Sequence, residues 1–213
     1  MTSSTSFRLY GRPGSGSAAC EAVLALAQMP YELFDLEKGA DGLLPAEILA
    51  LNPLRQVPVL ILPDGTVMTE SAAIILHLAG LAKHAGLAPT PGTAAHANYL
   101  RLMLFMAANT YMTDLRWYYP HRFSSDPSHA PAIKQKAGED QRLNWAALEA
   151  MAANGEALLS SGLSAADIYL AVLVSWTEFD DFVQIHPKLA AIARRVAKIP
   201  AITPVWRRHQ IAV

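Results

Sequence analysis

The stretch RQVPVLILPDGTVMTESAAI, residues 55–74, carries the most structural information in this chain. Two apolar runs flank Asp64-Gly65, a dipeptide typical of a tight turn between antiparallel strands. Pro58 stands directly before the first run, where a proline is tolerated at the start of a strand or in a cis turn. Glu70 and Ser71 open an alanine- and leucine-rich segment. The stretch therefore predicts a β-hairpin followed by a helix.

The residues before this stretch alternate short apolar runs with helical periodicity. FRLY (residues 7–10) predicts a strand, and the segment after it places Ala19, Val23 and Leu26 on one helical face. YELFDL (residues 31–36) predicts a second strand, and residues 45–51 a short helix. The order to residue 82 is thus strand, helix, strand, helix, strand, strand, helix, which is an α/β pattern.

The residues after this stretch predict helices alone. KHAGLAPTPGT (residues 83–93) holds two prolines and two glycines and is typical of a linker. Four long helical patterns follow, over residues 95–119, 130–153, 164–179 and 186–199. The fold class is therefore α/β plus all-α, with an N-terminal domain over residues 1–82, a linker over 83–93 and an all-helical domain over 94–213.

Composition narrows the classes of function. Acidic and basic residues nearly balance, with a formal net charge of −1, so no overall field attracts nucleic acid or an anionic membrane. Cys20 is the only cysteine of the 213 residues, which excludes an intramolecular disulfide and any metal site with several cysteines. We expect a reducing compartment and no metal.

We expect neither a secretory signal nor a membrane span in this chain. The N-terminus MTSSTSF is polar and lacks the basic and apolar blocks of a secretory signal. No segment reaches about 18 uninterrupted apolar residues, the length that a membrane helix needs. We therefore expect a cytoplasmic protein with small-molecule partners, and neither membrane nor nucleic acid among them.

Three separated motifs resemble the cytosolic glutathione S-transferase family. They are RQVPVL with Pro58, TESAAI with Glu70 and Ser71, and LSAAD, where Ser164 and Asp167 form a capping-box pattern. Their order and spacing match that family over nearly the whole chain. The resemblance implies a thioredoxin-like N-terminal domain, a helical C-terminal domain, a homodimer, and glutathione as co-substrate without a metal.

The resemblance implies a set of glutathione-binding residues. Val57, before a cis Pro58, would offer its main-chain N–H and C=O to the cysteinyl part of glutathione. Glu70 would pair with the α-ammonium and Ser71 with the α-carboxylate, helped by the helix N-terminus. Gln56 would reach the peptide or its glycine end. Taken from the residues alone, a trans proline opening a strand and an ordinary helix cap at Ser71 remain open.

Three hydroxyls are candidates for the group that stabilises the glutathione thiolate. Tyr10 ends the first strand, Ser15 follows Pro13-Gly14 as in serine-using classes, and Ser17 lies close to the position that cysteine-using bacterial members occupy. Cys20 lies a turn inside the predicted helix, where a buried cysteine behaves as a small apolar residue. This favours thiolate stabilisation by a serine over mixed-disulfide chemistry.

The segment NTYMTDLRWYYPHRF (residues 109–123) is rich in aromatic residues. The family builds its electrophile site from the first loop and the helices that open the second domain. The resemblance therefore implies an apolar, aromatic site for a hydrophobic electrophile, with packing as the alternative for each ring. The residues are Tyr111, Arg116, Trp117 and Tyr119.

The resemblance implies a glutathione S-transferase that transfers the thiolate to a hydrophobic electrophile in detoxification. The same thiolate also suits a glutathione-dependent isomerase, dehalogenase, lyase or peroxidase. A non-catalytic member that binds ligands or docks to proteins is the remaining alternative.

Overall fold

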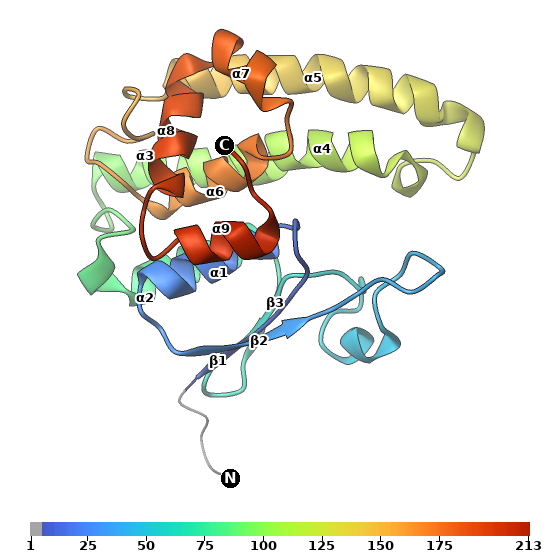
Figure 1. Cartoon of the computed structure of the whole chain (residues 1–213), viewed down its shortest axis with the longest axis horizontal. Helices are drawn as coiled ribbons and strands as arrows, with labels where there is room; N and C mark the ends of the chain where they lie inside the picture. The colour runs from blue at the N-terminus through green and yellow to red at the C-terminus, as the bar shows by residue number, and fades with distance from the viewer. Residues whose placement is uncertain (1–5) are drawn as a thin grey trace. The chain divides into compact units, whose positions relative to one another are not determined.

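The computed structural model describes residues 6–213. Contacts divide the chain into two compact units, of which the first contains residues up to 88 together with residues 195–213. The sequence prediction placed residues 195–213 in the helical domain instead. The elements of the first unit are β1 (Phe7–Gly11), α1 (Ser17–Leu26), β2 (Tyr31–Asp35), a 3₁₀ helix (Ala46–Ala50), β3 (Val59–Ile61), β4 (Val67–Met68), α2 (Ser71–Leu81), a 3₁₀ turn (Lys83–Ala85) and α9 (Thr203–His209) (Figure 1).

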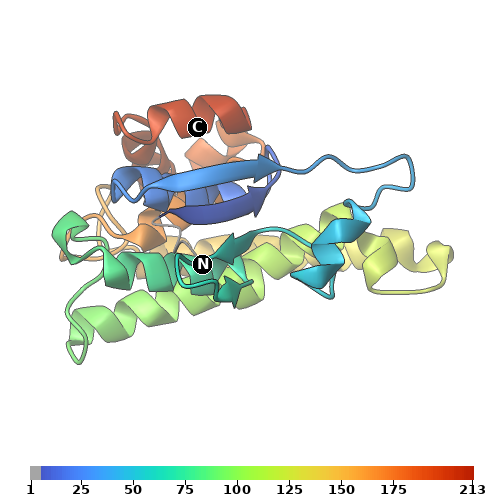
Figure 2. The ribbon, with the colours of Figure 1, turned by 90° about the horizontal axis from the view of Figure 1, so that it is seen from below.

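The first unit contains a four-stranded sheet in the order β2-β1-β3-β4. β1 and β2 are parallel, with Leu9 opposite Leu33, and Figure 2 shows them side by side. β3 is antiparallel to both β1 and β4, and the β3–β4 hairpin turns at Gly65 with a φ of 90°. A left-handed backbone at this turn suits glycine, so the predicted hairpin at Asp64-Gly65 is confirmed.

Helices α1 and α2 pack together and supply much of the core of this unit. Residues 17–24 of α1 are all buried, and α2 adds Ile74, Ile75 and Leu78. α1 crosses between two parallel strands, which requires a connection of this length. Together with the hairpin and α2, this gives the predicted thioredoxin-like arrangement.

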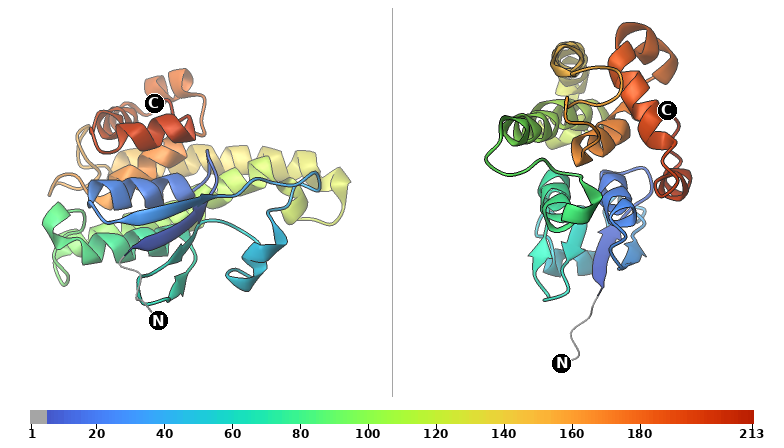
Figure 3. Two further views of the ribbon diagram at one scale, coloured as in Figure 1. Left: turned by 60° about the horizontal axis from the view of Figure 1, so that its bottom comes forward. Right: turned by 90° about the vertical axis from the view of Figure 1, so that its left-hand side faces the viewer.

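The second unit, residues 89–194, is helical. Figures 1 and 3 show α5 running alongside the path of α3 and α4. α6 is buried at every residue and begins with the predicted capping box, in which the Ser164 N–H donates to Asp167 Oδ2 at 2.7 Å. The elements of the second unit are α3 (Ala94–Phe105), a π-helical turn (Met106–Thr110), α4 (Tyr111–Tyr118), 3₁₀ turns (Pro120–Arg122 and Pro127–His129), α5 (Ala130–Met151), α6 (Ala165–Val174) and α7 (Phe179–Ile185). α8 (Pro187–Ala197) begins in this unit, and its last three residues belong to the first.

Three helical details differ from the sequence prediction. The pattern over residues 95–119 forms α3 and α4 joined by the π-helical turn, which periodicity alone does not reveal. The pattern over 164–179 ends at Val174, where Ser175 and Thr177 direct their hydroxyls to the carbonyls three residues earlier. The short helices α7 and α9 were not predicted, because seven residues give too few turns for a clear period.

Candidate functional site

Three loops of the first unit meet at one end of its sheet. β1 runs toward this end, and β3 starts from it, because Tyr10 near the end of β1 pairs with Val59 at the start of β3. β4 runs antiparallel to β3 and so returns to the same end, where α2 begins at Ser71. The topology therefore brings together the β1–α1 loop, the segment before β3 and the start of α2.

The β1–α1 loop holds two serine hydroxyls within hydrogen-bond distance of each other. Ser15 Oγ lies 2.8 Å from Ser17 Oγ and donates to the Arg12 carbonyl at 2.7 Å. Ser17 Oγ accepts from the Arg12 N–H at 3.1 Å and lies 3.2 Å from the Arg12 carbonyl. The Arg12 carbonyl is thus within reach of both hydroxyls, and one hydroxyl can turn its proton elsewhere while the other keeps this contact.

The two serines differ in access to solvent. Ser15 is half-buried, whereas Ser17 is only 1% exposed. Ser17 Oγ also lies against Gly11, where an added Cβ would come within 2.6 Å of the hydroxyl oxygen. Ser15 is accordingly the more exposed of the two serines.

Tyr10 and Cys20 are both held in packing. The Tyr10 ring stacks on Phe34 with centroids 4.7 Å apart and packs against a buried cluster around Ile48. Cys20 is fully buried in α1, and burial raises the pKa of its thiol. A thiol without solvent access and without thiolate character is a poor nucleophile.

The segment before β3 presents the main chain of Val57. The Val57–Pro58 peptide bond is cis, as the resemblance implies. Among residues 6–213, no hydrogen bond within the chain uses the main-chain N–H or C=O of Val57. Asn52, buried at 5% exposure, donates from Nδ2 to the Gln56 carbonyl at 2.9 Å and so holds the turn. The sequence analysis did not single out Asn52. The Asn52-Pro53 dipeptide, which is typical of a turn, was the available signal.

Glu70 and Ser71 stand at the start of α2. Glu70 is the residue before the helix, with a φ of 65°, a left-handed value that is uncommon for a residue with a side chain. Glu70 is the residue at the cap position of this helix, and its side chain makes no capping hydrogen bond. The Glu70 side chain is exposed, and the Ser71 carbonyl accepts a weak contact from Cys20 Sγ at 3.8 Å.

The aromatic residues of the second unit pack within that unit to different degrees. The Tyr111 ring meets the Trp176 ring edge-on at 5.1 Å, and Arg116 Nη1 pairs with Asp140 at 3.3 Å. Trp117 is 43% exposed and lies over Gly138 of α5, with a ring atom 3.3 Å from where a Cβ would stand.

Tyr119 is half-buried and stacks with a neighbouring cation. The Arg122 guanidinium lies 4.4 Å from the Tyr119 ring centroid, and the His121 ring meets it edge-on at 6.1 Å. Such a cation–π contact orders the turn after α4. Of the four residues expected to contact the electrophile, Trp117 is therefore the most exposed to solvent.

Asp114 is a buried acid that the sequence analysis did not single out. It lies on α4 at 2% exposure, and its Oδ1 accepts from Gln141 Nε2 at 2.6 Å. Burial raises the pKa of Asp114 to about 7, and the Gln141 hydrogen bond only partly opposes this. The carboxyl therefore holds its proton to a higher pH than an exposed aspartate does.

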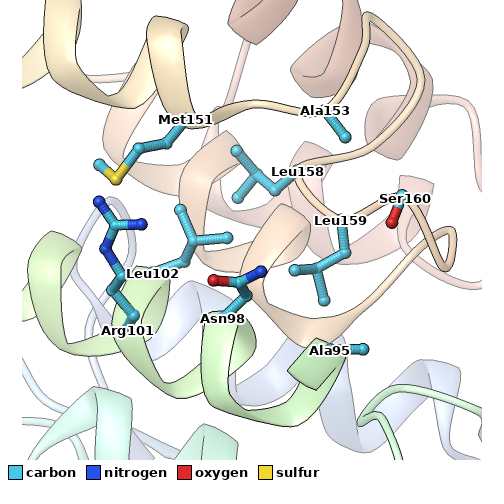
Figure 4. A pocket seen from close by; sticks show the side chains of 9 residues that line it. All are labelled: Ala95, Asn98, Arg101, Leu102, Met151, Ala153, Leu158, Leu159 and Ser160. Atoms are coloured by element: carbon cyan, nitrogen blue, oxygen red, sulfur yellow. The ribbon is translucent and has the colours of Figure 1, made fainter. Parts of the chain in front are cut away.

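A cavity of about 160 Å³ lies in the second unit, away from every residue assigned above. Figure 4 shows the Arg101 side chain extending toward Met151, with leucines over much of the remaining wall. Residues 6–213 contain no group of three or more histidine, cysteine or acidic side chains placed to hold a metal. In the same range no helix is both long and apolar enough to cross a membrane.

Comparison with known proteins adds a family model and full-length relatives. The model described as "Glutathione S-transferase, N-terminal domain" matches residues 17–81. The uncharacterized GST-like protein YncG of Escherichia coli K12 is 31% identical over 206 residues, which cover 96% of this chain and 98% of that protein.

Solved structures give the same result for the fold. A glutathione transferase homologue from Sulfitobacter with bound glutathione superposes with a TM-score of 0.87 at 24% identity, covering 98% of this chain and all of that one. A sphingomonad glutathione S-transferase complexed with glutathione gives a TM-score of 0.79 at 26% identity, with 96% and 100% coverage.

Proposed function

The chain belongs to the glutathione S-transferase family, and on that premise we propose that it binds glutathione as a thiolate and transfers it to a hydrophobic electrophile. The observation that carries the proposal is the meeting of Ser15, the free main chain of Val57 and the Glu70-Ser71 pair at one end of the sheet. These groups differ in chemistry and match the thiol, the cysteinyl main chain and the γ-glutamyl group of glutathione.

Each group of this site has one proposed role in binding. The Val57 N–H and C=O pair with the cysteinyl main chain, as an added strand pairs with a sheet edge. Glu70 pairs with the α-ammonium of the γ-glutamyl group, and Ser71 binds its α-carboxylate at the start of α2. Gln56, which is exposed, reaches the glycine end.

Ser15 is the proposed donor to the thiolate. A thiol has a pKa of about 8.5, and a hydrogen bond to a charged acceptor contributes about 1.5–3 kcal/mol. One pKa unit corresponds to about 1.4 kcal/mol, so this bond alone lowers the pKa by about 1–2 units. Ser15 redirects its proton from the Arg12 carbonyl to the sulfur, while Ser17 keeps the carbonyl contact. Tyr10 keeps a packing role.

The reaction then follows from the thiolate. A sulfur lone pair forms the new C–S bond with an electron-poor carbon. In a substitution the leaving group departs with its bonding electrons, and in an addition the electrons move onto the π system, which takes a proton from solvent. Tyr111, Arg116, Trp117 and Tyr119 are the residues proposed to contact the electrophile. We also infer a cytoplasmic location and a homodimer, and sedimentation equilibrium of the purified protein would test the homodimer.

Calorimetric titration with reduced glutathione tests the binding site. Glu70→Gln removes the charge that pairs with the α-ammonium, and we expect about tenfold weaker binding, the effect of one charge-assisted hydrogen bond. The control Glu32→Gln changes an exposed acid on β2 and should leave affinity unchanged.

The dipeptide cysteinylglycine sharpens this test because it lacks the γ-glutamyl group. The wild-type protein should prefer glutathione over the dipeptide, and Glu70→Gln should lose most of that preference. An absence of binding by the wild-type protein at millimolar glutathione would contradict the proposed function. A screen with aryl halides, epoxides, hydroperoxides, enones and disulfides would then identify the electrophile.

A further inference from the structure

The C-terminal helix of the chain contacts the loop that carries the candidate serines. α9 packs beside α1 within the first unit, as Figure 1 shows, and its last residue is His209. The Gly14 N–H donates to His209 Nδ1 at 3.2 Å, across 195 residues of sequence. Gly14 directly precedes Ser15, so this bond holds the main chain at the candidate thiolate donor.

The hydrogen bond determines which ring nitrogen of His209 carries the proton. Nδ1 accepts from Gly14 and must be unprotonated, so the proton of the neutral ring is on Nε2. Nε2 lies 2.9 Å from Glu21 Oε2, which accepts this proton's hydrogen bond. The His209 side chain has no exposed surface, and that of Glu21 is 5% exposed. The ring is therefore held between a main-chain donor and a buried carboxylate.

Glu21 is itself held in place by several donors. Burial raises the pKa of Glu21, but the hydrogen bonds and charges of His209 and Arg208 outweigh burial, and the pKa lies below its usual value. Arg208 Nε donates to Glu21 Oε1 at 3.1 Å, Nη2 contacts Oε2, and the Tyr31 hydroxyl donates at 3.3 Å. Arg208 Nη2 also lies 2.7 Å from His209 Nε2, because both groups converge on this carboxylate.

Arg208 connects this cluster to the sheet. Its Nη1 contacts both carboxylate oxygens of Asp35, at 2.9 and 2.7 Å, at the end of β2. The fixed fork geometry of a guanidinium is used toward Glu21, where Nε and Nη2 each contact one carboxylate oxygen. The chain of contacts therefore runs from β2 through Arg208, Glu21 and His209 to the Gly14 main chain.

We propose that His209 is a positioning residue for the thiolate site, acting through its hydrogen bond to the Gly14 N–H. The catalytic consequence rests on the proposed function, but the bond itself is testable without glutathione. Gly14 has a φ of 70°, a left-handed conformation that a glycine adopts freely and leaves as freely. An external acceptor at its N–H selects one conformation and thereby the direction of the Ser15 hydroxyl.

Two matched substitutions separate this role from simple packing. In His209→Asn the side-chain oxygen can stand near the position of Nδ1 and accept from Gly14. In His209→Gln the amide can stand near Nε2 and donate to Glu21, but no acceptor faces Gly14. Both replacements are neutral, polar and smaller than histidine. If His209 acts through packing alone, the two variants should therefore change Gly14 exchange and the bound thiol to the same extent.

The first readout is amide hydrogen exchange at Gly14, measured by NMR on the protein without ligand. We expect exchange about tenfold faster in His209→Gln, the factor that the loss of an ordinary hydrogen bond implies, and near the wild-type rate in His209→Asn. The second readout is ultraviolet absorbance of the bound thiolate. The pKa of bound glutathione should rise in His209→Gln by about one unit, with affinity changed less than threefold.

Equal Gly14 exchange in the two variants would overturn the proposal. So would faster Gly14 exchange in His209→Gln with no change in the bound thiol, because the bond would then have no part in the reaction. If the wild-type protein does not bind glutathione, the proposed function fails while the Gly14 measurement still decides on the bond. Should His209→Gln fail to fold, the nitrogen shifts of the wild-type ring decide, and a proton on Nδ1 would overturn the proposal.

Discussion

Replacing Asp114 by asparagine is expected to stabilise the protein by an amount that grows as the pH rises from about 4 to above 7. Asp114 is buried in α4, and burial raises its pKa to about 7. Asparagine has nearly the same shape as the protonated acid. Its side-chain oxygen can still accept from Gln141, which donates to Asp114 at 2.6 Å. The variant therefore resembles the wild-type protein with its acid permanently neutral.

The magnitude follows from the two pKa values of Asp114. In the unfolded chain an aspartate has a pKa of about 3.9, so the folded state binds the proton more tightly. Stability from the neutral acid is fully present below pH of about 4 and is lost as the pH rises to about 7. The three pKa units between the two states correspond to a loss of about 4 kcal/mol of unfolding free energy at pH 8.5, relative to low pH. At pH 5 the loss is about 1.5 kcal/mol.

Urea unfolding of both proteins at pH 5 and pH 8.5 measures this difference. The advantage of Asp114→Asn in unfolding free energy should grow by about 2.5 kcal/mol between the two pH values, against about 0.5 kcal/mol for an ordinary surface substitution. The control Asp180→Asn changes an exposed acid on α7 and should show no such growth. An advantage of Asp114→Asn that is the same at both pH values would refute the reasoning.

Four further outcomes are expected. Ser15→Ala should raise the pKa of bound glutathione by about 1–2 units in a thiolate absorbance titration, and an unchanged titration would transfer the role to another hydroxyl. Gly11→Ala should cost about 1–3 kcal/mol in urea unfolding, because its Cβ would stand 2.6 Å from Ser17 Oγ. Glu21→Gln should cost about 1–3 kcal/mol at pH 7, since it weakens the charge-assisted hydrogen bonds from Arg208 while Arg208 keeps its contact with Asp35. Because the folded pKa of Glu21 is lowered, this difference should shrink as the pH falls below about 4. Cys20 should react with a thiol reagent only in denaturant, and labelling of the native protein would show that α1 opens.

Much of the fold could be predicted because its elements carry local signals. Asp64-Gly65 marks a hairpin whatever the rest of the chain does, and Ser164 with Asp167 marks a helix start within four residues. The π-helical turn at Met106–Thr110 and the seven-residue helix α9 have no such signal. Their conformations depend on what they pack against.

The candidate site also combines features that local motifs predict with features that depend on packing. The resemblance of local motifs to the family implied roles for Val57, Glu70 and the serine-rich loop, because a proline, an acid–serine pair and glycines have characteristic backbone roles over a few residues.

Only the tertiary structure distinguished an accessible Ser15 from a buried Ser17, and only it joined Gly14 to His209. It also gave Asp114 a raised pKa. Burial and hydrogen bonding between distant residues are properties of packing, which no pattern within a few residues contains. Local patterns therefore determined most of the elements and motifs of this protein, and packing decided which of their side chains are exposed to solvent and which protons they hold.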